Sequence, residues 1–245
     1  MASNDPCRKF DNKRIVVTEN GPYSVESGIP LVSKIQVVSE HGEPLTWQTE
    51  GRITVSEDWY CLCRCGQSRL HPFCDGTHRT VGFDGTESAD TGLSESRARA
   101  FPGGTRIMVK KDGLLCTQAG FCGLRDVGIR QLVTSTNDTS TRSLVIAMVE
   151  RCPSGALTYR IEADGRDIEP DLPQQVAVTT EITTEGPIAG PLWVTGGIPI
   201  ERSDGQPFET RNRVTLCNCG HSHSKPLCDG THRQAEVRRR PITGQ

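Results

Sequence analysis

The sequence is poor in the side chains that build large hydrophobic cores. Hydrophobic residues occupy 34% of its 245 positions and aromatic residues 5%, whereas apolar residues including glycine make up roughly 45–50% of average proteins. The 25 glycines and 15 prolines favour turns over long regular elements. Such a chain can build several small cores, and we expect another kind of interaction to help stabilise them.

Long apolar runs and a charge excess are also lacking. No apolar stretch is long enough to predict a membrane span, and the first residues lack the apolar segment of a secretory signal. The formal net charge of −2 gives no overall field that favours nucleic acid or an anionic membrane. We interpret the three arginines at 238–240 as a solvated tail. These absences predict a soluble cytoplasmic protein whose thiols stay reduced.

The motifs of common catalytic sites are missing as well. The sequence contains no recognisable Ser/His/Asp arrangement, phosphate-binding loop or dinucleotide fingerprint. We therefore predict that the protein is not an enzyme acting on an organic substrate.

Cysteine, by contrast, is abundant and clustered. The 11 cysteines are an odd number, and two C-x-C pairs occur at 63/65 and 217/219. A disulfide framework prefers an even count with separated partners, whereas C-x-C can place two thiolates on one metal atom. The cysteines therefore favour metal ligation.

Two cysteine segments repeat one another. Residues 63–78 read CRCGQSRLHPFCDGTH and residues 217–232 read CNCGHSHSKPLCDGTH, so both follow C-x-C-G-x-S-x-x-x-P-x-C-D-G-T-H. Each segment is preceded by matching Gly-Pro turns, including those at Gly21 and Gly190. Shared spacing of this kind predicts two modules of one design.

These segments resemble the CDGSH-type, or NEET, iron–sulfur domain. In that family three cysteines and one histidine bind one 2Fe-2S cluster, and threonine here replaces the serine of the family name. The resemblance implies two ligand sets, which we call the first set (Cys63, Cys65, Cys74 and His78) and the second set (Cys217, Cys219, Cys228 and His232).

Elementary chemistry agrees with this ligand assignment. The C-x-C pair can hold one iron, while Cys74 and His78 are four residues apart and can share one face of a helical turn. Asp75 suits a helix cap and Gly76 allows close backbone approach, as do their counterparts in the second copy. Three cysteines and one histidine also suit structural zinc, which stays an alternative, although zinc sites more often use C-x₂₋₄-C pairs.

A single histidine ligand has two consequences. It places the expected reduction potential between the roughly −400 mV of plant-type clusters and the about −150 to +300 mV of clusters with two histidines. A protonated imidazole cannot ligate iron, so we expect cluster release below neutral pH.

The middle of the chain resembles half of a bacterial ferredoxin and a divergent single-cluster ferredoxin domain. The apolar pattern predicts strands at 106–110 and 156–161 and a helix at 143–151. The motif Cys116-x₂-Ala119-x₂-Cys122 with Cys152-Pro153 has alanine at the second ligand position of a cubane motif. Three thiolates favour 3Fe-4S, with 4Fe-4S and three buried structural thiols as alternatives.

The other singled-out residues receive weaker assignments. Cys61 is predicted to be a core thiol, and Cys7 receives no role. Ser68 and Ser222 either donate to cluster sulfur or cap their loops. His71 is the nearest non-ligand histidine and could tune the first cluster electrostatically.

The predicted fold class is α+β. We expect a first CDGSH module at 1–85, a ferredoxin-like α+β insert at 86–172 and a second CDGSH module at 173–245. CDGSH domains resemble half-units that pair by exchanging strands across a two-fold axis. We favour a pseudo-two-fold pair inside a monomer, with a homodimer as the alternative.

Three centres on one chain favour an electron-transfer protein with a redox partner. The alternative is an iron or cluster donor to an apo iron–sulfur acceptor, or a redox sensor, because each signature contains one labile histidine. A third class is an interaction module with structural metal only. The sequence predicts no nucleic-acid or membrane partner.

Overall fold

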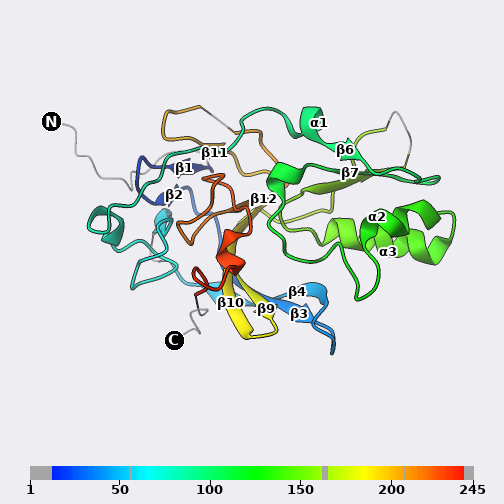
Figure 1. Cartoon of the computed structure of the whole chain (residues 1–245). Helices are drawn as coiled ribbons and strands as arrows, with labels where there is room; N and C mark the ends of the chain where they lie inside the picture. Colours follow the sequence, from blue (N-terminus) through cyan, green and yellow to red (C-terminus); the bar gives the residue numbers. More distant parts are fainter. Residues whose placement is uncertain (1–12, 56, 162–164, 207, 240–245) are drawn as a thin grey trace.

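Two sheets contain strands from both halves of the chain (Figure 1). The computed structural model describes residues 13–55, 57–161, 165–206 and 208–239. One sheet has the order β11-β1-β2-β5 and the other has the order β12-β10-β9-β3-β4. The strands of the first sheet are β1 (Ile15–Val17), β2 (Tyr23–Val25), β5 (Tyr60–Leu62) and β11 (Ile200–Glu201). Those of the second are β3 (Leu31–Val38), β4 (Pro44–Ile53), β9 (Gln175–Thr183), β10 (Gly186–Thr195) and β12 (Arg213–Leu216).

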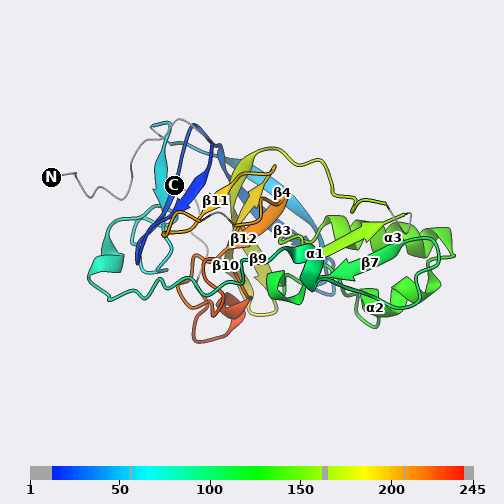
Figure 2. The same ribbon diagram turned by 90° about the horizontal axis from the view of Figure 1, so that it is seen from above.

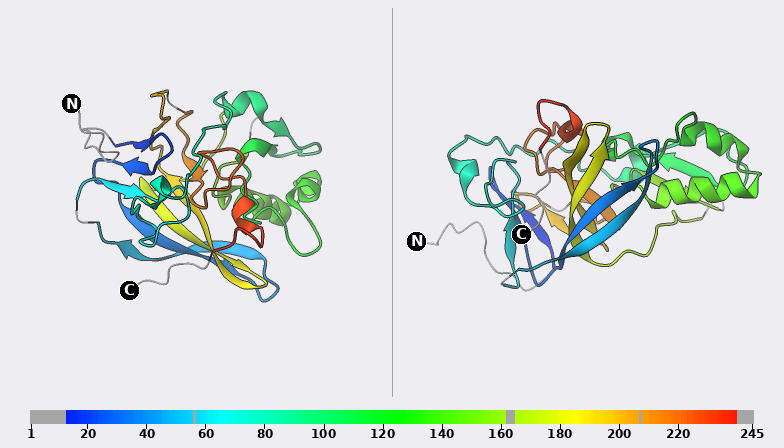
Figure 3. Two further views of the ribbon diagram at one scale, coloured as in Figure 1. Left: turned by 60° about the vertical axis from the view of Figure 1, so that its left-hand side comes forward. Right: turned by 90° about the horizontal axis from the view of Figure 1, so that it is seen from below.

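Each half of the repeat contributes a strand to the sheet of the other half. In the repeat, β1 corresponds to β9, β2 to β10, β3 to β11 and β5 to β12. Strand β11 pairs in parallel with β1, with Ile200 opposite Ile15, and β3 pairs in parallel with β9, with Leu31 opposite Val176. The crossing strands can be followed in Figure 3. The expected pseudo-two-fold pair with exchanged strands therefore forms within one chain.

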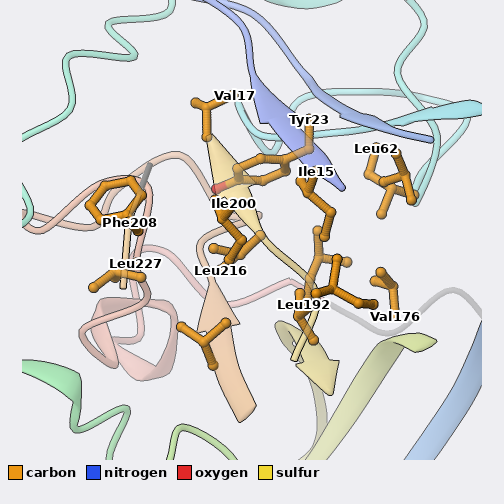
Figure 4. Close-up of a cluster of buried hydrophobic side chains, with 14 of the residues drawn as sticks. Ile15, Val17, Tyr23, Leu62, Val176, Leu192, Ile200, Phe208, Leu216 and Leu227 are labelled. Carbon is orange, nitrogen blue, oxygen red and sulfur yellow. The ribbon is translucent and has the colours of Figure 1, made fainter. Parts of the chain in front are cut away.

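A shared hydrophobic core holds the two modules together. Tyr23 and Leu62 of the first module are buried against Leu192 and Leu216 of the second (Figure 4). Burial of one large apolar side chain is worth about 1.5–3 kcal/mol. Since this core consists of side chains from both modules, neither module can bury its apolar face alone.

The insert between the modules has a small core of its own. Its sheet has the order β6-β7-β8, and Val109, Val145, Val149 and Leu157 are among the side chains buried between that sheet and its helices. It lies to one side of the paired modules, drawn in green in Figure 2. Its elements are α1 (Ser94–Arg97), β6 (Arg99–Ala100), β7 (Met108–Lys111), α2 (Ile129–Leu132), α3 (Thr139–Glu150) and β8 (Leu157–Arg160).

The sequence predicted the elements of the insert better than their ends. Helix α3 starts four residues before the predicted 143, because the Asp138 side chain accepts a hydrogen bond from the Thr141 N–H at 2.7 Å and caps the helix. Strands β7 and β8 overlap the predicted strands at 106–110 and 156–161. The described part of the chain also contains four short 3₁₀ helices: η1 (Thr77–Arg79), η2 (Gly113–Leu115), η3 (Val133–Ser135) and η4 (Thr231–Arg233).

Among the described residues, no helix has the length and apolar character needed to cross a lipid bilayer.

Candidate metal centres

The first ligand set lies in the loop between β5 and η1 and consists of two close pairs of donor atoms. The Sγ atoms of Cys63 and Cys65 are 3.7 Å apart. The Sγ atom of Cys74 lies 3.4 Å from Nδ1 of His78, which η1 turns toward the cysteine.

The second ligand set repeats this geometry between β12 and η4. Cys217 and Cys219 have their Sγ atoms 3.6 Å apart, and Cys228 Sγ lies 3.3 Å from His232 Nδ1. The two copies agree because the same backbone hydrogen bonds fold both loops. Cys63 N–H donates to Pro72 O at 2.7 Å, and Cys217 N–H donates to Pro226 O at 2.8 Å.

These distances fit pairs of ligands on tetrahedral metal atoms. Two thiolates bonded to one such atom at about 2.3 Å lie about 3.8 Å apart, and a thiolate and an imidazole lie about 3.6 Å apart. Among the described residues, no three His, Cys, Asp or Glu side chains converge on a single metal ion. The donor atoms of each CDGSH ligand set therefore come in two close pairs.

An aspartate and a glycine shape the end of each ligand loop. Asp75 accepts hydrogen bonds from the backbone N–H groups of Thr77 and Arg69 at 3.0 and 2.9 Å. Hydrogen bonds from Thr77 and Arg69 hold the pKa of the Asp75 carboxyl well below its usual range. Gly76 then has a φ of +87°, and its N–H donates to Cys74 Sγ at 3.4 Å. The expected cap at Asp75 was wrong by one residue, because Gly76 is the residue directly before η1 and Asp75 instead braces the turn that leads into it. A Cβ on Gly76 would meet nothing within 4 Å, so the expected close backbone approach is found only at its counterpart Gly230.

The repeated serines brace the loops. Ser68 Oγ donates to Phe73 O at 2.6 Å, and Ser222 Oγ donates to Leu227 O at 2.7 Å. Of the two roles considered for these serines, the hydroxyls therefore perform the loop-capping one.

The thiols of each C-x-C pair differ in acidity. A hydrogen bond with Cys65 is the main reason that the pKa of Cys63 falls to about 4, while the pKa of Cys65 rises. The nearby His71 ring contributes to the lowering at Cys63. Cys217 behaves in the same way, because its hydrogen bond with Cys219 lowers its pKa to about 6. Each C-x-C pair therefore contains one thiol that is more acidic than its neighbour.

The two ligand sets differ in burial. Cys228 and His232 are each 2% exposed, whereas His78 is 8% exposed and Cys74 is only half-buried. Burial accordingly raises the pKa of Cys228 well above its ordinary value. The first set lies closer to solvent than the second.

The two ligand loops touch through their backbones. A Cβ on Gly66 would come within 2.3 Å of Cys219 O, and a Cβ on Gly220 would come within 2.4 Å of Cys65 O. Arg239 connects the same loops, since its Nη atoms donate to Gly66 O at 3.0 Å and Asn218 O at 2.6 Å. Arg238 and Arg239 are half-buried, so the interpretation of a solvated tail was wrong for these two, and the third arginine lies outside the described residues.

A third group of cysteines, Cys116, Cys122 and Cys152, lines a cavity in the insert together with Ala119. We call these three cysteines the middle ligand set. Ala119 is 6% exposed and supplies no donor atom from its side chain. Burial raises the pKa of Cys122, as expected for a thiol facing an enclosed site.

The middle ligand loop also touches the second one. A Cβ on Gly230 would lie 3.0 Å from Thr117 O, and Gln118 Nε2 donates to Asp229 O at 3.4 Å. Thr117 follows Cys116 directly, and Asp229 follows Cys228 directly. The sequence offered no signal for this contact, because 111 residues separate its partners.

The nine cysteines of the three ligand sets are all free thiols. Cys61, predicted to be a core thiol, is instead disulfide-bonded. Cys61 lies on β5, two residues before Cys63. Cys7 lies outside the described residues.

Ligand chemistry and repeat geometry together define an iron–sulfur protein, and comparison with known families agrees. The family described as iron-binding zinc finger CDGSH type matches residues 20–79 and 189–233. The family described as divergent 4Fe-4S mono-cluster matches residues 103–162. The chain thus contains two CDGSH-type segments with a divergent mono-cluster segment between them. No curated protein matches the chain.

Proposed function

We propose that this chain is an electron-transfer protein with a 2Fe-2S cluster in each CDGSH ligand set and a 3Fe-4S cluster in the middle set. When bound, each cluster can accept and release one electron. The proposal includes no catalysis on an organic substrate, and it implies a redox partner protein.

The observation that carries the proposal is the unbroken series of contacts between the three ligand loops. The middle loop touches the second through Thr117 and Gly230, and the second touches the first through Cys219 and Gly66. Loops in direct backbone contact keep neighbouring centres close. A protein that only stored or delivered single clusters would not need this arrangement.

Burial supports the same order of sites. The second ligand set, in the centre of the series, is the most buried, with Cys217, Cys219, Cys228 and His232 at 4% exposure or less. The terminal sets include half-buried cysteines, among them Cys74 and Cys122. Electrons would therefore enter and leave at the two ends and cross the protein through the buried set.

Ala119 supports the 3Fe-4S assignment of the middle site. A 4Fe-4S cluster needs a fourth ligand, and the side chain at the second position of the motif has no donor atom. The matching family is described as a 4Fe-4S type, so 4Fe-4S with a non-protein fourth ligand is the alternative.

Cluster donation is the second candidate function. It is favoured by the half-buried Cys74 and by the imidazole ligand beside it, because ligands near solvent exchange more readily. In this candidate, an apo iron–sulfur protein would take the cluster from the first ligand set.

One experiment separates the two functions. The anaerobic holoprotein, reduced with dithionite and freed of excess reductant, is mixed with either an oxidised Rieske-type 2Fe-2S protein, whose potential lies above the expected one, or an apo-ferredoxin. Visible absorbance and iron content of each protein are followed. Electron transfer predicts rapid reduction of the Rieske-type acceptor with iron retained on this chain. Cluster movement to the apo-ferredoxin without electron transfer to the Rieske-type acceptor would overturn the proposal and favour the donor.

A further inference from the structure

The histidine of the second ligand set has a buried carboxylate partner. His232 Nε2, the ring nitrogen that does not face Cys228, lies 3.1 Å from Glu181 Oε2. The side chains are 2% and 0% exposed, respectively. Arg233 pairs with the same carboxylate oxygen. The other oxygen, Oε1, is buried with no hydrogen-bond partner among the described residues.

The first ligand set has a neutral residue where the second has this glutamate. Thr18 and Thr179 mark the correspondence, since their Oγ1 atoms donate to Pro22 O and Pro191 O in the equivalent hairpins. Two residues further on, the first hairpin has Asn20 and the second has Glu181. Asn20 Oδ1 accepts from Gly85 N–H at 2.8 Å. No carboxylate among the described residues forms an ion pair with His78.

A carboxylate on the distal nitrogen changes what the imidazole supplies to a metal. It accepts the ring N–H, fixes the tautomer and makes the ligating nitrogen more basic. A more basic ligand and a buried negative charge both stabilise the oxidised cluster relative to the reduced one. Arg233 offsets part of the charge, but its own side chain is 27% exposed and more screened by solvent.

We infer that Glu181 makes the second site the more reducing of the two CDGSH centres, so that electrons pass from the second ligand set to the first. This inference rests on the proposed function. In the transfer, one electron leaves the reduced centre at the second set, which is oxidised, and enters the oxidised centre at the first set, which is reduced. No bond forms or breaks. A low-potential one-electron donor protein supplies the next electron at the middle ligand set.

The first ligand set is suited to the receiving end. Its ligands lie closer to solvent than those of the second set, with His78 8% exposed and His232 2% exposed. Exposure therefore favours the first set as the place where electrons leave.

The test is a redox titration of the intact holoprotein followed by electron paramagnetic resonance. We expect two 2Fe-2S signals with separate midpoints. The variants His78→Cys and His232→Cys assign each signal to its site, because replacing the histidine lowers the potential of that site alone. The lower wild-type midpoint should belong to the second set.

Glu181→Gln then tests the cause. It keeps the shape and removes the charge, and we expect at least a tenfold shift of the equilibrium between the two centres toward reduction of the second, or about 59 mV for a one-electron couple. Arg233→Gln should shift the same midpoint in the opposite direction. The matched control is Glu185→Gln, an exposed glutamate on the same hairpin, which should leave both midpoints in place.

The outcomes distinguish the inference from the function beneath it. Equal midpoints, a reversed order, or a Glu181→Gln midpoint equal to wild type would overturn the inference while leaving an electron-transfer protein. Absence of both 2Fe-2S signals would overturn the proposed function itself. If Glu181→Gln fails to load its cluster, the Arg233→Gln midpoint decides, and a midpoint that rises or stays would contradict the inference.

Discussion

Gly66 lies against the carbonyl oxygen of Cys219 so closely that a Cβ at residue 66 would come within 2.3 Å of that oxygen. The reciprocal pair, Gly220 and the Cys65 carbonyl, has the corresponding value of 2.4 Å. Both glycines also have positive φ, at +77° and +86°. The close contact of the two CDGSH ligand loops therefore depends on the absence of a side chain at two equivalent positions.

The first prediction concerns this contact. Gly66→Ala should destabilise the protein by about 1–2 kcal/mol through its positive φ and by a further ~1–3 kcal/mol through the clash with rigid backbone. Thermal unfolding of the anaerobic holoprotein, followed by far-ultraviolet circular dichroism, measures the loss. A protein of this size loses roughly 2–4 °C of Tm for each kcal/mol.

Gly42→Ala is the control for Gly66→Ala. Gly42 has a φ of +84°, and a Cβ there would meet nothing within 4 Å. The Tm of Gly42→Ala should therefore fall only by the amount that the positive φ costs. Equal losses for the two variants would show that the ligand loops do not need their close approach.

The second prediction concerns Tyr23, which belongs to the first module and supports the second ligand loop. Its hydroxyl donates to Cys217 O at 2.7 Å and lies 3.0 Å from Pro226 O, and the ring is fully buried. Tyr23→Phe leaves buried carbonyls without this donor and should cost about 1–3 kcal/mol. Tyr60→Phe removes a similar buried hydrogen bond, to Ile29 O at 2.9 Å, and is the matched control.

Both tyrosine variants should lower Tm, but only Tyr23→Phe should speed loss of the second cluster. Each tyrosine variant is combined with His78→Cys or with His232→Cys, so that one histidine-ligated site remains in each protein. The rate at which a chelator bleaches the visible absorbance then measures cluster loss from that site. Equal rates in the two tyrosine variants would contradict a specific role for Tyr23.

The third prediction concerns the middle site. Ala119→Cys places a thiol at the missing ligand position, on the wall of the cavity that Cys116, Cys122 and Cys152 already line. The wild-type protein, isolated oxidised, should show the paramagnetic signal of a 3Fe-4S cluster, and the variant should lose it as a fourth iron binds. Ala119→Ser, with a weaker ligand, is the control. A wild-type protein without that signal and with four irons at this site would contradict the assignment.

The fourth prediction concerns acid. The pKa of Asp75 is depressed, so the stability contributed by its carboxylate is present above the ordinary carboxyl pKa of about 4 and is lost only below it. Burial lowers the pKa of His78, so the unfolded chain binds its proton first and stability falls as pH drops through roughly 6.5. Between about pH 4 and 6, His78 is therefore the weak point of the first set.

Visible absorbance of the anaerobic holoprotein as a function of pH measures this loss. His78→Cys should remove the acid-induced loss at the first site, while His41→Gln, at an exposed histidine, should not. If acid bleaches His78→Cys as it bleaches the wild type, a group other than His78 is responsible for the acid sensitivity.

The sequence predicted two cysteine loops of one geometry and the pairing of the modules because the motif is repeated in it. The spacing of Cys63, Cys65, Cys74 and His78 recurs around Cys217, and donor-atom pairs 3.3–3.7 Å apart result in both loops. The strand exchange followed from the resemblance to paired half-units. Periodic apolar positions such as Val145 and Val149 located the helix of the insert, although its cap moved the start.

The features that remained hidden are contacts between distant, unrepeated residues. Glu181 is 51 residues from His232, and nothing in the sequence around either residue shows that the carboxylate meets the ring. Arg239 lies in a run of basic residues, which predicts a solvated side chain. Its guanidinium instead donates to the carbonyl oxygens of Asn218 and Gly66, which are 21 and 173 residues away. Local patterns predict ligands and elements, whereas the environment of a cluster depends on how the modules pack.

The most direct measurement of the central claim is Mössbauer and electron paramagnetic resonance spectroscopy of the anaerobically purified protein, with iron and acid-labile sulfide determined on the same sample. Two 2Fe-2S clusters and one 3Fe-4S cluster predict about seven irons and about eight sulfides per chain, with histidine-perturbed signals from the reduced 2Fe-2S pair. Stoichiometric zinc without labile sulfide would contradict the account.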